Sequence, residues 1–491
     1  MPKFVNSYKQ KQGSVLFSDK IRTLREAEKI PQRTMAKALG IGVPMYCRIE
    51  RGVRSVRKEQ IPIIAEALNT DSEELLKLWL ADHIAALMEG EEEVFNEVFV
   101  IAKENKKMKS NNKRTFTLID MFAGCGGLSL GMEQAGFKSI FFNEIIPVFA
   151  STYLYNRSIP NGHYYIGDIN KLNEEIGNYE HIWNNIDGGV DLVCGGPPCQ
   201  GFSMANRQRI IDDPRNNLYR AYLRFLQNVR PKFFVMENVK GMAQRIPEIK
   251  EDFIKYLGED YVVDYKLLRA QDFGVPQNRE RLFLIGNRMG IEPQIIFNAI
   301  ERNKRIPFVL RDALIGLPHL EAKKVKNKGD LEELSTGLTE RVYSYIENDF
   351  YRFINGNRSI NKLYNHKNRY NNPRDIEIYS RLPQGANSLH ESIQDIMPYK
   401  NRNDIFKDKY FKLDETQICK TITSHMKFDC NMYIHPWESR GLSPREAARI
   451  QTFPDDYVIK GAQNQWYAQV GNAVPVKLAE AIGKSILEFL R

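Results

Sequence analysis

The spacing of hydrophobic positions changes near residue 114. Before it, apolar residues recur three and four positions apart, which predicts amphipathic helices. After it, short apolar runs alternate with amphipathic stretches, which predicts an α/β fold with a parallel sheet covered by helices on both faces. The predicted regions are an all-α unit at 1–82, a linker at 83–113, the α/β domain at 114–310, an irregular polar region at 311–457 and a C-terminal segment at 458–491 that returns to the α/β domain.

The N-terminal region contains two short predicted helices that are joined by a glycine turn. The first follows Pro31 and stops at Gly40, and the second begins at Pro44, where the missing N–H costs nothing. The stretch LREAEKIPQRTMAKALGIGVPMYCRIERG resembles phage-repressor-like helix-turn-helix domains. That resemblance places Val43, Met45, Tyr46 and Arg48 at the start of the recognition helix, the part that enters the major groove, and implies that Met45, Tyr46 and Arg48 bind DNA. The alternative is a protein-interaction module of the same shape.

Composition narrows the class of protein. The formal charge of +9 and the pI near 9.0 favour a polyanionic partner, although many basic proteins bind no nucleic acid. The six cysteines include no C-x-x-C pair and do not cluster with histidines, so neither a disulfide framework nor a metal site is expected. Without a long apolar run or a signal peptide, we expect a cytoplasmic protein with no membrane partner.

A glycine-rich turn follows the first predicted strand, at residues 123–127. Such a turn fits a dinucleotide, a phosphate or S-adenosylmethionine, or is merely tight. Acidic residues end the next two strands. Glu144 can bond ribose hydroxyls, and Asp168 suits an adenine amino group or an ammonium group. Ligands collect at such strand ends, so we predict a cofactor site there.

The fourth and fifth predicted strands carry the candidate catalytic groups. Cys199 lies in DLVCGGPPCQGFS on a proline-braced loop, where a cysteine is a candidate nucleophile. The fifth strand ends in Glu237-Asn238-Val239, and a carboxyl group beside a buried thiol site can act as a proton donor or hydrogen-bond partner. Gln277, Arg279 and Arg281 alternate along a later strand, so we expect them to face the same way. The two guanidinium groups on one face would bind a phosphate or lock a carboxylate.

These motifs occur in a fixed order. The set FAGCGG, PPCQGFS, MENVKG, QNRERLFLIG and QVGNAVPV resembles the motif series of the DNA (cytosine-5)-methyltransferases and spans residues 114–491. The resemblance implies an S-adenosylmethionine-dependent methyltransferase (Rossmann-like) domain and a small target-recognition domain, with double-stranded DNA as the partner. It implies a cofactor pocket formed by Phe122, Gly124, Gly126, Leu128, Glu144, Asp168, Ile169, Pro198, Leu218, Asn472 and Val474.

The resemblance also implies the catalytic roles. Cys199 would add to carbon 6 of cytosine so that carbon 5 can accept the methyl group, and Glu237 would stabilise charge at N3. Arg279 and Arg281 would brace the active site. The base must leave the duplex to be reached. DNA contacts are expected from Ser203, Gln277 and Thr421, the last in a Thr-Ile pair that resembles the one in the recognition domains of the family.

Several hypotheses follow from the resemblance. The enzyme would belong to a restriction–modification system, in the cytoplasm with the nucleoid, beside a cognate restriction endonuclease that acts on the same site. The N-terminal domain would bind operator DNA and repress a promoter near its own gene. The alternatives are a tRNA methyltransferase of the same fold and a transcriptional regulator with a silent catalytic domain. The recognition sequence and the oligomeric state stay open.

Overall fold

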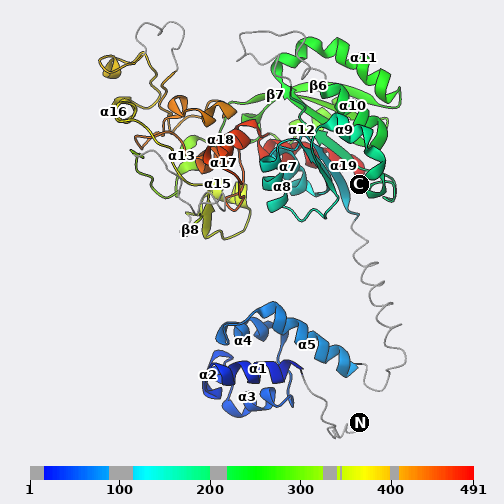
Figure 1. Ribbon diagram of the computed structural model, residues 1–491, viewed down its shortest axis with the longest axis vertical. Coiled ribbons are helices and arrows are strands. Elements are labelled where there is room, and N and C mark those ends of the chain that lie inside the picture. The colour runs from blue at the N-terminus through cyan, green and yellow to red at the C-terminus, as the bar shows by residue number, and fades with distance from the viewer. Residues whose placement is uncertain (1–15, 88–113, 199–217, 325–339, 343–345, 399–408) are drawn as a thin grey trace. The chain divides into compact units, whose positions relative to one another are not determined.

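The computed structural model describes residues 16–87, 114–198, 218–324, 340–342, 346–398 and 409–491. The chain divides into two compact units, Met1–Arg114 and Thr115–Arg491. Figure 1 shows the N-terminal unit as helices only and the second unit as a sheet flanked by helices, next to a region with little regular structure. The predicted α/β fold class, with an all-α N-terminal region, is confirmed.

Five α-helices within the described residues 16–87 pack around one core in the first unit. Ile21, Tyr46 and Ile64 are fully buried in this core. A buried ion pair between Arg25 and Glu50 joins the first helix to the third. The helices are α1 (Leu16–Ala27), α2 (Gln32–Ala38), α3 (Val43–Glu50), α4 (Ile61–Ala67) and α5 (Ser72–Leu87), so the last one continues five residues past the predicted boundary at 82.

A seven-stranded sheet forms the centre of the second unit. Its strand order is β3-β2-β1-β4-β5-β7-β6. The first five strands are parallel, and β7 runs antiparallel to both of its neighbours. The strands are β1 (Phe116–Met121), β2 (Phe137–Glu144), β3 (Tyr164–Ile166), β4 (Leu192–Gly195), β5 (Phe233–Val239), β6 (Val262–Arg269) and β7 (Glu280–Asn287).

Helices cover both faces of this sheet, which explains why the central strands β1 and β4 are buried along their whole length. Leu118 belongs to the cluster on one face and Ile119 to the cluster on the other, as the period of two requires. The first face is covered by α7 (Gly127–Ala135), α12 (Pro293–Glu301) and α19 (Val476–Leu490), and the second by α9 (Ile169–Glu174), α10 (Leu218–Val229) and α11 (Ile246–Leu257). At the β3 edge lies α8 (Pro147–Tyr155).

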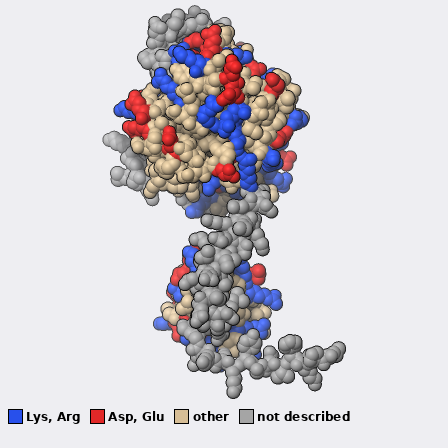
Figure 2. Space-filling model, turned by 90° about the vertical axis from the view of Figure 1, so that its right-hand side faces the viewer, with Lys and Arg blue, Asp and Glu red and all other residues tan. Residues whose placement is uncertain are grey.

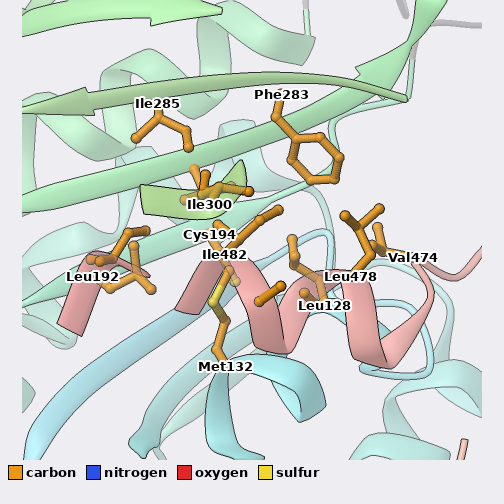
Figure 3. Packing of buried hydrophobic residues seen from close by; sticks show 14 of the residues in the cluster. Leu128, Met132, Leu192, Cys194, Phe283, Ile285, Ile300, Val474, Leu478 and Ile482 are labelled. Carbon is orange, nitrogen blue, oxygen red and sulfur yellow. The ribbon is translucent and has the colours of Figure 1, made fainter. Parts of the chain in front are cut away.

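The first and last helices of this unit pack against each other. Figure 3 shows Leu128 and Met132 of α7 facing Leu478 and Ile482 of α19 below the strands. Two glycines permit the close approach. A Cβ at Gly127 would lie 2.6 Å from the carbonyl oxygen of Val474, and one at Gly131 would lie 2.3 Å from that of Val476. The C-terminal segment thus completes the core beneath the glycine-rich turn.

Residues beyond 310 form a region with short elements and many buried polar groups. Arg440 is fully buried against Glu446, which also lies close to His435. The apolar core of this region includes Cys125 from the glycine-rich turn, so the two parts share buried surface. The elements are α13 (Leu310–Leu314), β8 (Glu340–Val342), α15 (Asp349–Asn355), β9 (Lys362–Tyr364), α16 (Pro373–Arg381), the 3-10 turn η11 (Ser424–Lys427), α17 (Pro444–Ile450) and α18 (Gln463–Asn472).

Candidate functional site

The carboxyl ends of β1 to β5 meet at one edge of the sheet, because these strands are parallel. The glycine-rich turn follows β1, Glu144 ends β2, and Asp168 comes soon after β3. The loop that leads to Cys199 follows β4. The fold therefore gathers these predicted residues at a single edge.

Glu144 shapes the glycine-rich turn directly. One carboxylate oxygen accepts the N–H of Gly124 at 2.7 Å, and the other accepts the N–H of Ile146 at 2.8 Å. Burial raises the pKa of the Glu144 carboxyl, and the two backbone N–H groups oppose that shift. Each oxygen keeps a lone pair, so the carboxylate can still accept a hydroxyl donor.

The turn itself requires glycine. Gly124 and Gly126 have φ values of +57° and +80°, where a side chain is strained. A Cβ at Gly124 would point into open space, whereas one at Gly126 would strike Arg157. Phe122 also has a positive φ of 57°, which is uncommon for a residue with a side chain. The turn is therefore open on the side of Gly124 and closed on the side of Gly126.

The other residues predicted for the cofactor pocket differ in exposure. Phe122 and Leu218 are half-buried against the same apolar cluster, whose members include the buried Ile169. Asp168 caps α9 by accepting the N–H of Asn170 at 2.9 Å. Leu128 is buried beneath the turn, and Pro198 is exposed at the end of the described loop.

The C-terminal residues reach this edge through α18. Asn472, its last residue, is exposed, and Val474 is buried against Gly127. Gln451 fixes the turn between α18 and α19 by donating to the carbonyl oxygens of Val470 and Ala473 at 2.8 and 3.2 Å. The sequence motif placed Asn472 and Val474 at the pocket but gave no role to Gln451.

Glu237 lies beside the loop after β4. Its carboxylate pairs with Arg281 at 3.0 Å, and the two side chains are 13% and 17% exposed. In the antiparallel ladder Arg281 lies opposite Val239, so its side chain is diagonal to that of Glu237 on the same face. A Cβ at Gly196 would lie 3.1 Å from Glu237 Oε2, which places this carboxylate against the loop.

The next residue of β5 anchors that loop. Asn238 is buried, and its amide donates to the carbonyl oxygen of Pro197 at 2.9 Å. The Gly-Pro-Pro backbone is thus held to β5 two residues before Cys199. Cys199 and Ser203 themselves lie outside the described residues.

Gln277 and Arg279 precede β7 and do not lie in it, contrary to the predicted strand. The expected DNA contact of Gln277 is also wrong for this arrangement, because its side chain is fully buried. Gln277 donates to Gln451 at 2.9 Å and accepts the N–H of Ile422 at 2.7 Å. Its sequence neighbours gave no sign that the recognition region would cover it.

Arg279 is buried at the meeting point of three segments. It donates to the carbonyl oxygens of Ile422 at 2.8 Å and Gly471 at 3.3 Å. Within the described residues, its Nε has no hydrogen-bond partner. Burial, and then the charge of Arg281, hold the pKa of Arg279 well below its usual value.

Thr421 borders this buried cluster. Its hydroxyl donates to the carbonyl oxygen of Asn278 at 2.5 Å, and its own carbonyl accepts the Tyr433 hydroxyl at 2.7 Å. The residues that follow include the exposed side chains of His425 and Phe428. The segment after Thr421 is therefore fixed at its base and exposed at its tip.

In the N-terminal unit, α3 presents only part of the predicted contact set to solvent. Arg48 is exposed and Met45 is half-buried. The prediction for Tyr46 is wrong, because this side chain is fully buried in the core. Tyr46 shares the inner face of the helix with Ile49, three positions on, and the helical period fixes this burial.

The surface charge is mixed. On the face in Figure 2, basic and acidic side chains are interspersed, so the net charge is not gathered into one large patch there. Across the described ranges, no helix has the length and apolar character to span a membrane. Those ranges also hold no cluster of three or more potential metal ligands.

Comparisons with known proteins agree with this geometry. A family model described as C-5 cytosine-specific DNA methylase matches residues 116–488, and one described as helix-turn-helix matches residues 21–75. Type II methyltransferase M.PspPI of Psychrobacter sp. (strain TA137) is 32% identical over 78% of this chain and 82% of its own length. Type II methyltransferase M1.HphI of Haemophilus parahaemolyticus is 33% identical over 76% of this chain and 87% of its own.

A solved structure shows the same architecture. It is described as a prophage-encoded DNA modification methyltransferase from Escherichia coli, and it is 27% identical with a TM-score of 0.60, over 77% of this chain and 99% of that one. The second unit therefore has the fold of an α/β methyltransferase. The chain belongs to the C-5 cytosine-specific DNA methylase family and carries a helix-turn-helix domain at its N-terminus.

Proposed function

We propose that residues 115–491 transfer a methyl group from S-adenosylmethionine to carbon 5 of a flipped cytosine within a specific duplex sequence. The observation that carries this proposal is the juxtaposition of Glu237, paired with Arg281, and the Gly-Pro-Pro loop that leads to Cys199. The glycine-rich turn and Glu144 end neighbouring strands at the same edge. A carboxyl group, a thiol and a cofactor turn together suit this methyl transfer.

The proposed nucleophile is Cys199, and the other cysteines of this unit support the assignment. Cys125, Cys194, Cys419 and Cys430 are buried, and burial raises the pKa of each thiol. None of the four is suited to form a thiolate near neutral pH. Cys199 instead follows two prolines in a loop that Asn238 anchors to β5.

Glu237 would recognise the cytosine ring. Its pairing with Arg281 orients one carboxylate oxygen and leaves the other beside Gly196. A carboxyl group in that position can hydrogen-bond N3 and the exocyclic amine while the thiolate of Cys199 adds to carbon 6. Arg279 would brace the site through Ile422 and Gly471 without touching DNA.

The residues at the turn fit S-adenosylmethionine, which supplies the methyl group when bound. Gly124 leaves open space where a Cβ would stand, and Glu144 retains acceptor capacity for ribose hydroxyls. Ile145 and Ile146 expose 60% and 41% of their surface directly after Glu144, which suits an apolar adenine face. Asp168, Phe122, Leu218, Asn472 and Val474 would complete the pocket, with Pro198 at its rim.

The relatives are type II methyltransferases, so we place this enzyme in a restriction–modification system with a cognate endonuclease. Flipping the base costs a few kcal/mol, which pocket contacts would offset. Thr421 and the exposed segment after it would read the duplex sequence, with Ser203 on the catalytic loop as a further DNA contact.

The test is methyl transfer from labelled S-adenosylmethionine to unmethylated genomic DNA, followed by bisulfite sequencing. We expect one short sequence to carry a methylated cytosine. Cys199→Ser should abolish the signal, and Cys47→Ser, in the N-terminal unit, should retain it. Transfer to tRNA but not DNA, or full activity in Cys199→Ser, would contradict the proposal.

We further propose that the N-terminal unit binds operator DNA near the protein's own gene. The exposed Arg48 and Val43 on α3 support this assignment. Full-length protein should retard a promoter fragment in a mobility-shift assay, and a chain lacking residues 1–80 should not. Equal retardation by both would refute operator binding by this unit.

A further inference from the structure

Two side chains outside the predicted motifs, Arg157 and Tyr457, bind the backbone carbonyl groups of the glycine-rich turn. Arg157 follows α8, and its side chain is only 5% exposed. It donates from Nη2 to the carbonyl oxygen of Gly126 at 2.9 Å and from Nη1 to the hydroxyl of Tyr457 at 2.9 Å. The Tyr457 hydroxyl in turn donates to the carbonyl oxygen of Cys125. Two consecutive carbonyl groups of the turn are thus fixed by this pair.

The guanidinium has little freedom of its own. Its Nε donates to both carboxylate oxygens of Glu133, at 2.9 and 3.0 Å, in a charge-assisted contact. Its centre lies 4.0 Å from the ring centroid of Tyr153, which covers one face. A Cβ at Gly126 would lie 2.6 Å from Nη1, so the turn packs directly on the guanidinium.

Glu144 accepts the N–H of Gly124 in the same turn. The turn is therefore held both by an N–H group, through Glu144, and by two carbonyl groups, through Arg157 and Tyr457. Tyr457 belongs to the segment after α17, which is distant in sequence from the sheet. The same segment contributes Phe453, which lies against Gly127.

We infer that Arg157 and Tyr457 are positioning residues for cofactor binding, and that they couple the glycine-rich turn to the end of the recognition region. The inference rests on the proposed use of S-adenosylmethionine. Neither side chain is assigned to the ligand or to DNA. They set the turn geometry on which the hydrogen bond between Glu144 and Gly124 depends.

The test measures cofactor affinity and turn mobility separately. S-adenosylmethionine is titrated calorimetrically into the full-length protein without DNA, and hydrogen exchange is followed in the peptide over residues 122–128. Arg157→Met removes the guanidinium that bonds Gly126 and Tyr457, and Tyr457→Phe removes one hydroxyl while keeping the ring. Arg449→Met is the matched control, since Arg449 is a buried arginine paired with Asp455 at 2.7 Å that also donates to the carbonyl oxygens of Ala313 and Ile315, outside the turn.

We expect both variants to bind S-adenosylmethionine about tenfold more weakly, which corresponds to the loss of one charged or well-placed hydrogen bond. Exchange over residues 122–128 should accelerate without ligand. The control should lose thermal stability and keep its affinity. Affinities within twofold of wild type together with unchanged exchange, or an equal loss in the control, would overturn the inference. If the wild-type protein binds no S-adenosylmethionine, the proposed function fails, and the exchange measurement still decides whether the pair holds the turn.

Discussion

Gly471 gives the sharpest test of how the C-terminal segment reaches the site. A Cβ there would lie 2.2 Å from the backbone nitrogen of Ser424 and 2.2 Å from the carbonyl carbon of Thr423. In an ordinary helix, glycine to alanine stabilises by about 1 kcal/mol. Here the atoms in the way belong to the backbone, which cannot rotate aside, and overpacking costs about 1–3 kcal/mol. The steric cost should therefore win in Gly471→Ala.

The size of the effect follows from the size of the unit. Unfolding entropy of about 2.1 cal/mol/K per residue, over roughly 380 residues, converts about 1 kcal/mol into a shift of about 1.3 °C. After the propensity gain of about 1 kcal/mol is subtracted, Gly471→Ala should lower the melting temperature by up to about 2.6 °C in scanning calorimetry. It should also lower methylation, because η11 and Asn472 must move apart. Gly177→Ala is the control, since a Cβ there meets no atom within 4 Å. Equal melting temperatures for the two variants would refute the steric argument.

Three further predictions concern catalysis, pH and DNA binding. Glu237→Gln breaks the pair with Arg281 and should lower kcat by about 10²–10⁴-fold, measured by methyl transfer at saturating cofactor; unchanged kcat would exclude Glu237 as the ring-binding carboxyl. Burial lowers the pKa of His435 to about 4, and its Nδ1 accepts the backbone N–H of Glu438 at 3.1 Å. In the unfolded chain the His435 imidazole has a pKa near 6.5, so it binds a proton before the folded protein does as the pH falls. The stability that neutral His435 contributes is therefore present above about pH 6.5 and is lost as the pH falls toward 4. His435→Gln should flatten the fall in melting temperature between these pH values, and an equally steep fall in the variant would show that other groups cause it. Arg48→Ala should weaken operator binding in mobility-shift titrations and leave genomic methylation unchanged, and equal operator affinity would remove α3 from the proposed interface.

Sequence patterns predicted which residues lie at the carboxyl ends of the parallel strands, because strand ends are marked by neighbouring residues in the sequence. Apolar runs that end in glycine or acid placed Glu144 at the end of its strand and Glu237 near the end of its own, and parallel strands bring such ends together. The direction of the Arg281 side chain, which pairs with Glu237, could also be predicted, since alternation along a strand fixes the face on which a side chain lies.

The same reasoning failed where a distant segment covers a residue. Gln277 carries the features of a surface residue, yet Ile422 and Gln451 bury it from another part of the chain. The prediction for Tyr46 failed for a different reason. The eight-residue helix has a buried face and an exposed face, and only its packing against the core decides which residues lie on the exposed one. Arg157 gave no signal, since a basic residue after a helix is usually exposed.

The packing of α7 against α19 also determines the order in which the two units can fold during synthesis. One face of the sheet, which α7 and α12 also cover, stays incomplete during synthesis until residues 476–490 are available, whereas α1 to α5 form a compact unit of their own from an earlier part of the chain. Domains generally fold as units as they leave the ribosome. We therefore expect a nascent chain to hold a finished helix-turn-helix domain well before the methyltransferase unit is complete. If the proposed operator binding holds, each polypeptide could bind its operator before it can methylate.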